Sequence, residues 1–208
     1  MKLYYHPWAC SLAPAIVAAE ANVPLDYIHV DILKDPHTLL DGTSYQTINP
    51  RHYVPVLQRD DGTLLSEVAA IVQYMADLVP GTLAPAPVEP RRLELQQWLT
   101  FIGTELHKMY SPWLFHPEVG EAAQAYARKK IANRYAYVEQ HLAGREYLLD
   151  GFTVADAYLF VPVNWAAGAK TPLADFPLIR AWFERMKARP AVQTALGLHA
   201  STPKRLAA

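Results

Sequence analysis

The chain has 208 residues, of which 51% are hydrophobic and 19% charged, a balance typical of a folded protein rather than a disordered one. Its formal net charge of -1 gives no basic footprint of the kind that binds nucleic acid or an anionic membrane. The single cysteine, Cys10, excludes an intrachain disulfide and a multi-cysteine zinc site. We therefore expect no metal, no nucleic-acid partner and no membrane partner.

The N-terminus lacks the charged-then-apolar pattern of a signal peptide, and no apolar run approaches the roughly 18 residues that span a bilayer. A lone thiol also suits a reducing compartment. These features predict a cytoplasmic protein.

The first eighty residues alternate predicted strands and helices. Hydrophobic periodicity and turn residues predict a strand at 2–5, a helix at 9–20, a strand at 26–30, an irregular stretch at 34–48, strands at 54–58 and 63–65, and a helix at 66–78. The helix between the first two strands predicts that they run parallel. The turn sequence Asp-Asp-Gly-Thr at 60–63 predicts that the last two are antiparallel.

A proline-rich segment divides the chain. Four prolines and a glycine fall within residues 80–90, a composition that continues neither a helix nor a strand. We expect a first domain at 1–79, a linker at 80–90 and a second domain at 91–208. The predicted fold class is an α/β domain with the order βαβ-ββα, followed by an all-α domain.

Apolar residues at helical spacing predict the helices of the second domain, at 91–110, 121–142, from 153 onward, and 177–189. Ser111-Pro112 is expected to end the first of these. Tyr126 is expected to face the core from the second. The segment Thr153 to Asp156 has the capping-box pattern, and the apolar residues after it predict a buried helix.

Cys10 lies where the first predicted strand gives way to a helix. The unpaired N–H groups of a helix start and the helix dipole favour a thiolate over a thiol. This position therefore predicts a lowered thiol pKa, and either a reactive thiolate or a site that prepares the thiolate of a bound ligand. The alternative is a buried cysteine that acts as a small hydrophobic residue.

Five separated segments resemble one known family. They are KLYYHPWACSLAP, INPRHYVPVL, DDGTLLSEVAAIVQYMAD, WLTFIGTELHKMYSP and FTVADAYLF, in that order. Together they are similar to the cytosolic glutathione transferases, specifically the bacterial beta class, over nearly the whole chain. The resemblance implies a thioredoxin-like N-terminal domain, a helical C-terminal domain, a homodimer, glutathione as co-substrate and a role in detoxification.

By this resemblance, Cys10 is the active-site cysteine, which lies against the glutathione sulfur and can form a mixed disulfide with it. Tyr5 matches a tyrosine that other classes use to donate to the glutathione thiolate, although it would equally suit the core of its strand. Ser11 either adds a hydroxyl donor or caps the helix.

Val54 and Pro55 match a cis-proline loop, whose backbone pairs with a peptide-like ligand as an added strand does; a purely structural proline is the alternative. Glu67 and the backbone of Val68 match the turn that holds the γ-glutamyl end of glutathione, although a glutamate there also complements the helix dipole. Lys34 lies near the position of a lysine that reaches the glycine carboxylate.

His107 matches a histidine directed at the glutathione site, and an ordinary pKa near 6.5 suits sharing a proton with a thiolate. Thr100, Thr104 and His107 are three to four residues apart, so we expect one polar helix face that lines the cleft. Two residues depart from the family pattern. Trp8 replaces a small residue, and Tyr53 replaces a glutamine.

Three functions follow as hypotheses. In the first, the glutathione thiolate attacks a small hydrophobic electrophile that lies over Trp8, Tyr110 and Trp113. In the second, Cys10 cycles through a mixed disulfide, so that the protein is a glutathione-dependent thiol–disulfide reductase. In the third, the protein binds hydrophobic ligands without catalysis, and its departures at Trp8 and Tyr53 support that reading.

Overall fold

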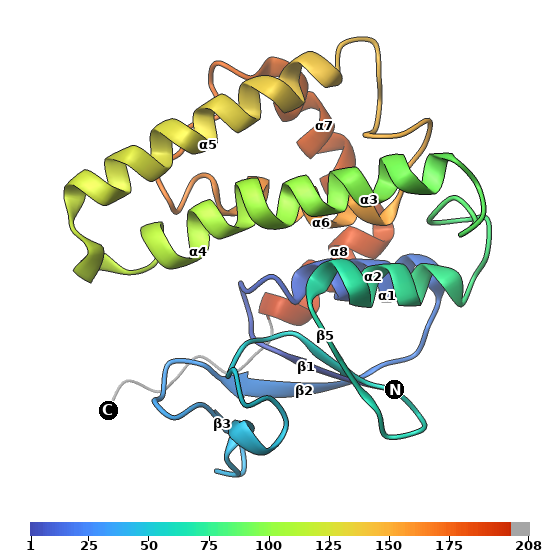
Figure 1. The fold of residues 1–208 in the computed structure, drawn as a ribbon, viewed down its shortest axis with the longest axis vertical. Helices are drawn as coiled ribbons and strands as arrows, with labels where there is room; N and C mark the ends of the chain where they lie inside the picture. The colour runs from blue at the N-terminus through green and yellow to red at the C-terminus, as the bar shows by residue number, and fades with distance from the viewer. Residues whose placement is uncertain (201–208) are drawn as a thin grey trace.

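A mixed five-stranded sheet and a set of helices form the computed structural model, which describes residues 1–200 (Figure 1). The strand order is β3-β2-β1-β4-β5. β1 and β2 are parallel and β4 and β5 are antiparallel, as predicted, and β4 also pairs antiparallel with β1, which the sequence did not predict. The N-terminal elements are β1 (Lys2–Tyr5), α1 (Leu12–Ala21), β2 (Asp26–Asp31), β3 (Thr38–Leu39), a 3-10 turn (Tyr45–Thr47), β4 (Val56–Gln58), β5 (Leu64–Ser66) and α2 (Val68–Asp77).

Strand β3 was not expected from the sequence, which predicted only an irregular stretch there. It contains two residues, which is too short for an alternating pattern, and it pairs antiparallel with the end of β2. The thioredoxin-like domain thus carries one more edge strand than the periodicity indicated.

Alternation along β1 decides what each face of the sheet packs against. Leu3 and Tyr5 point to the face covered by α1 and α2, and Tyr4 points to the opposite face with Val30 and Tyr45. Figure 1 shows α1 and α2 between the sheet and the helices of the second domain. One core therefore runs from the sheet through these two helices into the helical domain.

The rest of the described chain is helical. Its elements are α3 (Arg91–Phe101), a π-helical segment (Ile102–His107), α4 (Lys108–Leu114), a 3-10 turn (Pro117–Val119), α5 (Glu121–His141), α6 (Val154–Trp165), α7 (Pro177–Lys187) and α8 (Pro190–Ala200). Residues 201–208 of the predicted second domain lie outside the described residues. Among residues 1–200, no helix combines the length and the apolar character that crossing a membrane requires.

Three predictions about these helices were wrong. Helical structure continues past Ser111-Pro112 to Leu114, with Pro112 inside α4. Tyr126 is 59% exposed, since it is five residues from Ile131 and so points well away from it, whereas Ala127 is four residues away and buried. The third error is an omission: α8 lies beyond the last predicted helix, at 177–189, and was not predicted.

Two ion pairs join helices that are far apart in the sequence. The Arg92 guanidinium donates to both carboxylate oxygens of Asp77, at 2.8 and 3.0 Å, and so links α3 to the end of α2. Arg189 donates to both oxygens of Glu20, at 2.6 and 2.9 Å, and so links the start of α8 to α1. These bidentate contacts help to fix the helical domain against the domain that carries Cys10.

The predicted capping box at the start of α6 is confirmed. The Thr153 hydroxyl accepts from the Ala155 N–H, and the Asp156 carboxylate accepts from the Thr153 N–H at 3.0 Å. Asp156 is fully buried and also accepts from the Leu148 N–H and the Trp182 indole N–H. One carboxylate thus anchors α6, the preceding loop and α7.

We predict that Asp156→Ala lowers the free energy of unfolding by about 3–5 kcal/mol, because it leaves several buried donors without an acceptor. Urea denaturation followed by circular dichroism measures this. The control is Asp150→Ala, which removes an exposed ion pair with Arg91 and is expected to cost less than about 1 kcal/mol. Equal losses in the two variants would contradict the assigned role of Asp156.

Candidate functional site

Three contacts surround the loop that carries Cys10, and two of them join the domains. The Trp165 indole N–H on α6 donates to the Trp8 carbonyl at 2.7 Å. The Lys108 ammonium at the start of α4 lies 4.9 Å from the centre of the Tyr53 ring. The Cys10 thiol donates to the Val54 carbonyl at 3.4 Å. The segments around residues 6–11 and 51–55 and the starts of α4 and α2 therefore meet at one place.

Cys10 is a buried thiol in this structure, with 8% of its surface exposed. Burial raises its pKa from 9.0 to about 12; the Lys108 charge lowers this pKa and the Glu67 charge raises it. The change corresponds to about 4 kcal/mol, whereas a helix terminus contributes typically about 0.3–1 kcal/mol. Desolvation therefore outweighs the effect of the helix terminus, and the predicted lowered pKa of Cys10 is wrong for the protein without ligand.

The position of the helix start explains why its N–H groups do not lower the pKa of Cys10. α1 begins at Leu12, two residues after Cys10, and the Leu12 and Ala13 N–H groups donate to carbonyls of the preceding turn. These N–H groups are therefore not free to stabilise a sulfur anion at Cys10. The thiol remains a neutral, weak donor at pH 7.

Tyr5 and Ser11 make structural contacts close to Cys10. The Tyr5 ring is buried and packs edge-on against Tyr27 and His29 of β2 and tilted against His199 of α8, which favours the core reading. The Ser11 hydroxyl donates to the His6 carbonyl at 3.0 Å and accepts from the His6 N–H. It closes the turn and makes no cap contact with α1, so the predicted cap is wrong, while a donor role toward the ligand stays a prediction.

The backbone at Val54 and Glu67 has the form that a peptide-like ligand requires. The Val54–Pro55 bond is cis, as predicted. The Val54 carbonyl is held by Cys10, and among the described residues no partner occupies the Val54 N–H. Glu67 precedes α2 with φ of 70°, a backbone conformation that non-glycine residues adopt uncommonly.

Glu67 lies close enough to the Cys10 thiol for its charge to affect the thiol pKa, and Val68 follows it in the chain. The Glu67 charge acts on the pKa values of both Cys10 and Tyr158. Its carboxylate is exposed and pairs with Arg51 at 3.1 Å, while Val68 begins α2 and is buried. A helix start and a carboxylate thus lie next to each other, which suits a ligand group that carries both an ammonium and a carboxylate.

His107 is buried and neutral. Its Nδ1 lies 2.8 Å from the Tyr158 hydroxyl, and its ring packs against Trp165 at 5.3 Å. Burial lowers its pKa to about 4, with a further lowering from the Lys108 charge. The predicted titration near neutral pH is therefore wrong. With Tyr158 as donor, the ring carries its proton at Nε2 and can still donate.

The expected polar face of Thr100, Thr104 and His107 does not form. The π-helical segment has wider turns than an α-helix, so residues three to four apart no longer share a face. Thr104 is exposed and donates to the Thr100 carbonyl at 2.9 Å, while His107 turns into the core. The Lys34 ammonium pairs with Asp31 at 3.7 Å after β2, and its contact with the ligand stays a prediction.

The aromatic residues divide into an exposed and a buried group. Trp8 is 69% exposed, and Tyr53 and Trp113 are also exposed. Tyr110 is fully buried, with its hydroxyl bonded to those of Tyr135 and Thr171, so its predicted place over a second substrate is wrong. Its helical neighbour Trp113 is 38% exposed.

Sequence reasoning missed three residues of the site, namely Lys108, Tyr158 and Trp165. Lys108 directly follows His107, so its position next to a predicted site residue could have identified it from the sequence. Tyr158 and Trp165 lie on the apolar helix α6, whose pattern predicts burial and does not distinguish a core residue from one that contacts the site.

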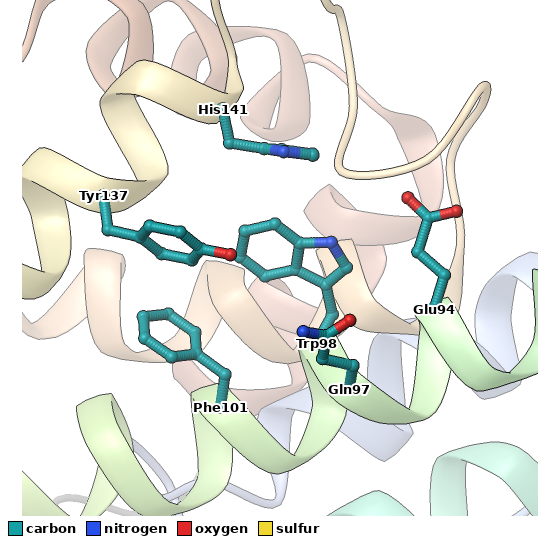
Figure 2. Close-up of a pocket in the computed structure, with 6 residues that line it drawn as sticks. All are labelled: Glu94, Gln97, Trp98, Phe101, Tyr137 and His141. Carbon is teal, nitrogen blue, oxygen red and sulfur yellow. The ribbon is translucent and has the colours of Figure 1, made fainter.

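The structure has hollows away from Cys10. One of about 310 Å³ lies between α3 and α5 and is lined by Glu94, Gln97, Trp98, Phe101, Tyr137 and His141 (Figure 2). Its aromatic rings pack on one another, and none of the predicted site residues line it. Within residues 1–200, no group of three or more His, Cys, Asp or Glu side chains could hold a metal ion.

We predict that Cys10 in the protein without ligand reacts with iodoacetamide at pH 7 at least roughly tenfold more slowly than free cysteine, because the thiol is buried and neutral. Mass spectrometry follows the reaction without ambiguity, since the chain has one cysteine. Protein unfolded in urea is the matched control and should react at the free rate. Rapid labelling of the folded protein, with an apparent pKa below 7, would restore the thiolate prediction.

The lowered pKa of His107 also predicts how stability depends on pH. Between about pH 4 and 6.5 the unfolded chain binds a proton at this histidine that the folded chain does not, so the free energy of unfolding falls as the pH falls. We expect His107→Gln to lose about 2 kcal/mol less than the wild type between pH 7 and pH 5, measured by urea denaturation. The exposed His116→Gln is the control. Identical pH profiles for all three proteins would refute the assignment.

Comparisons with known proteins extend over nearly the whole chain. The family model described as "Glutathione S-transferase, N-terminal domain" matches residues 9–78, and "Glutathione S-transferase, C-terminal domain" matches residues 94–190. Glutathione S-transferase GstA of Escherichia coli O157:H7 is 41% identical, over 94% of this chain and 97% of its own.

Solved structures agree with these matches. A sphingomonad glutathione S-transferase complexed with glutathione superposes with a TM-score of 0.92 and 37% identity, over 97% of this chain and 100% of the other. A beta class glutathione S-transferase from Sphingomonas chungbukensis gives a TM-score of 0.91 and 34% identity over the same shares.

Proposed function

The chain belongs to the glutathione S-transferase family, and from that premise we propose that glutathione binds beside Cys10 and that its sulfur, not the Cys10 sulfur, attacks the second substrate. The observation that carries this proposal is the buried thiol of Cys10 bonded to the Val54 carbonyl. It places a neutral sulfur donor next to backbone that can pair with a tripeptide.

The residues around the thiol suit the parts of glutathione. The Val54 N–H, next to the cis proline, can pair with the peptide backbone of the ligand as an added strand would. The Glu67 carboxylate suits the ligand ammonium, and the N–H groups at the start of α2 suit the γ-glutamyl carboxylate. The glutathione sulfur then extends toward Cys10 and the start of α4.

The reaction requires the glutathione thiol to lose its proton to solvent. The sulfur anion attacks the electrophilic carbon, a carbon–sulfur bond forms, and a halide leaves or an epoxide oxygen takes the released electron pair. The neutral Cys10 thiol and a neutral His107 are donors of hydrogen bonds, and Lys108 is the cation near both. Hydrogen-bond donors and a cation favour the ligand anion.

The second substrate would lie over Trp8 and Trp113. Trp8 is exposed while its carbonyl is fixed by Trp165, so the indole has a defined place at the domain junction. Phe115 packs edge-on against Trp165 at 5.2 Å and adds a partly exposed ring nearby. Such aromatic surface suits a small hydrophobic electrophile. A homodimer, a cytoplasmic location and a role in detoxification remain part of this proposal.

A thiol–disulfide reductase is the second candidate, favoured by the position of Cys10. In that reaction the Cys10 sulfur attacks a mixed disulfide of the substrate and glutathione, the substrate leaves as a thiol, and Cys10 keeps the glutathione as a mixed disulfide. A second glutathione then attacks this disulfide and releases oxidised glutathione and the Cys10 thiol. The raised pKa of Cys10 weighs against it as the attacking group. Binding of hydrophobic ligands without catalysis rests on the exposed Trp8 and Tyr53.

A titration of glutathione, read by thiolate absorbance near neutral pH, tests the proposal on the wild type and on Cys10→Ala. We expect both proteins to show the thiolate band, with conjugation of an aryl halide slowed by no more than about tenfold in the variant, the scale of one neutral donor. Disulfide exchange that depends on Cys10 should disappear.

Cys10→Ser is the matched control, because it keeps a neutral donor and should stay nearer to the wild type in conjugation. Loss of both the band and conjugation in Cys10→Ala alone would favour the reductase chemistry. Absence of glutathione binding in every protein would favour the non-catalytic candidate.

A further inference from the structure

A buried hydrogen bond joins His107 to Tyr158 beside the proposed glutathione site. The His107 Nδ1 atom lies 2.8 Å from the Tyr158 hydroxyl oxygen, and the two rings are nearly perpendicular, at 79°. Both side chains are buried. The charges of Cys10 and Glu67 add to the effect of burial on the pKa of Tyr158, so its hydroxyl lies within electrostatic reach of both groups. The pair therefore belongs to the same place in the structure as the thiol.

Helix α6 contacts the imidazole of His107 at two points. Tyr158 and Trp165 lie about two turns apart on this helix, so they share a face. The Trp165 ring packs against the His107 ring at 5.3 Å. Its indole N–H is already bonded to the Trp8 carbonyl, so it is not available to the imidazole. The Tyr158 hydroxyl is thus the group of α6 that bonds His107.

The number of protons in this pair decides which atom donates. Burial raises the pKa of Tyr158, and burial with the Lys108 charge lowers that of His107 to about 4, so at pH 7 the hydroxyl keeps its proton and the imidazole carries one. Among the described residues, the hydroxyl has His107 as its one hydrogen-bond partner. If Nδ1 carried the ring proton and donated it to Tyr158, the buried hydroxyl proton would have no acceptor there, which is unfavourable. The bond therefore runs from the Tyr158 O–H to Nδ1, and the ring proton is at Nε2.

We propose that Tyr158 is a positioning residue, which holds His107 in the tautomer with its proton at Nε2, so that this N–H donates to the sulfur anion of bound glutathione. This inference rests on the proposed function. Nε2 has no partner among the described residues and is not one of their fully enclosed polar atoms, so it reaches solvent. The other tautomer would turn the Nε2 lone pair toward the sulfur and repel its charge. One hydroxyl thus decides whether His107 stabilises the ligand thiolate.

Nitrogen NMR of the full chain with isotope-labelled histidine measures the tautomer without any ligand, because the protonated and the unprotonated nitrogen of a neutral imidazole have well-separated shifts. The chain has eight histidines, and the signals that are absent from His107→Gln identify His107. We expect the wild type at pH 7 to show a protonated Nε2 and an unprotonated Nδ1. In Tyr158→Phe the Nδ1 signal should move, since this nitrogen loses its donor. A protonated Nδ1 in the wild type, or identical His107 shifts in both proteins, would overturn the proposal.

The second measurement is the ionisation constant of bound glutathione, obtained by following the thiolate absorbance as the pH is varied. We expect Tyr158→Phe to lower this constant roughly two- to tenfold, the scale of one hydrogen bond. In the background of His107→Gln the same substitution should have no further effect, because Tyr158 acts through His107. Tyr135→Phe is the matched control: it removes a buried hydroxyl of the same domain, bonded to the Tyr110 hydroxyl and the Pro162 carbonyl, and should leave the constant unchanged.

Independent effects of the two substitutions would contradict the proposal, because their losses would then add in the double variant. A wild-type ionisation constant in Tyr158→Phe would contradict it as well. Absence of the thiolate band in every protein would instead be a failure of the proposed function. The two failures are distinguishable, since the NMR measurement reports the tautomer of His107 in protein that contains no glutathione.

Discussion

Exclusion of water from the Cys10 thiol is the constraint on which the chemistry of this site depends. The sulfur lies at the junction of two domains, and its hydrogen bond to the Val54 carbonyl replaces contact with solvent. Burial keeps it neutral despite the helix start that follows it. A neutral sulfur donates a weak hydrogen bond, so the reactive anion is assigned to the ligand. The division of roles between two sulfurs thus follows from desolvation.

Contacts between the domains surround the loop that carries Cys10, so they are part of the proposed site. Trp165 fixes the backbone of Trp8, and Lys108 reaches the ring of Tyr53. The pairs of Arg92 with Asp77 and of Arg189 with Glu20 hold the helical domain in place at two further positions. A change at any of these contacts is expected to alter the exposure of the thiol as well as the shape of the cleft.

The sequence predicted the parts of this protein that depend on local pattern. Alternation and turn residues indicated four of the five strands and their pairing, and the capping box of α6 was read directly from Thr153 and Asp156. Effects of packing were not predictable. The π-helical segment that turns His107 away from Thr104, the burial of Tyr110 and the raised pKa of Cys10 all arise from helices that meet only in three dimensions.

A crystal structure of the protein with glutathione tests the central claim most directly. The account predicts a tripeptide whose backbone pairs with Val54, whose ammonium lies within hydrogen-bond distance of Glu67, and whose sulfur contacts Cys10 without a bond between the two sulfurs. A tripeptide bound elsewhere, or a covalent disulfide to Cys10 formed with the reduced ligand under reducing conditions, would contradict it.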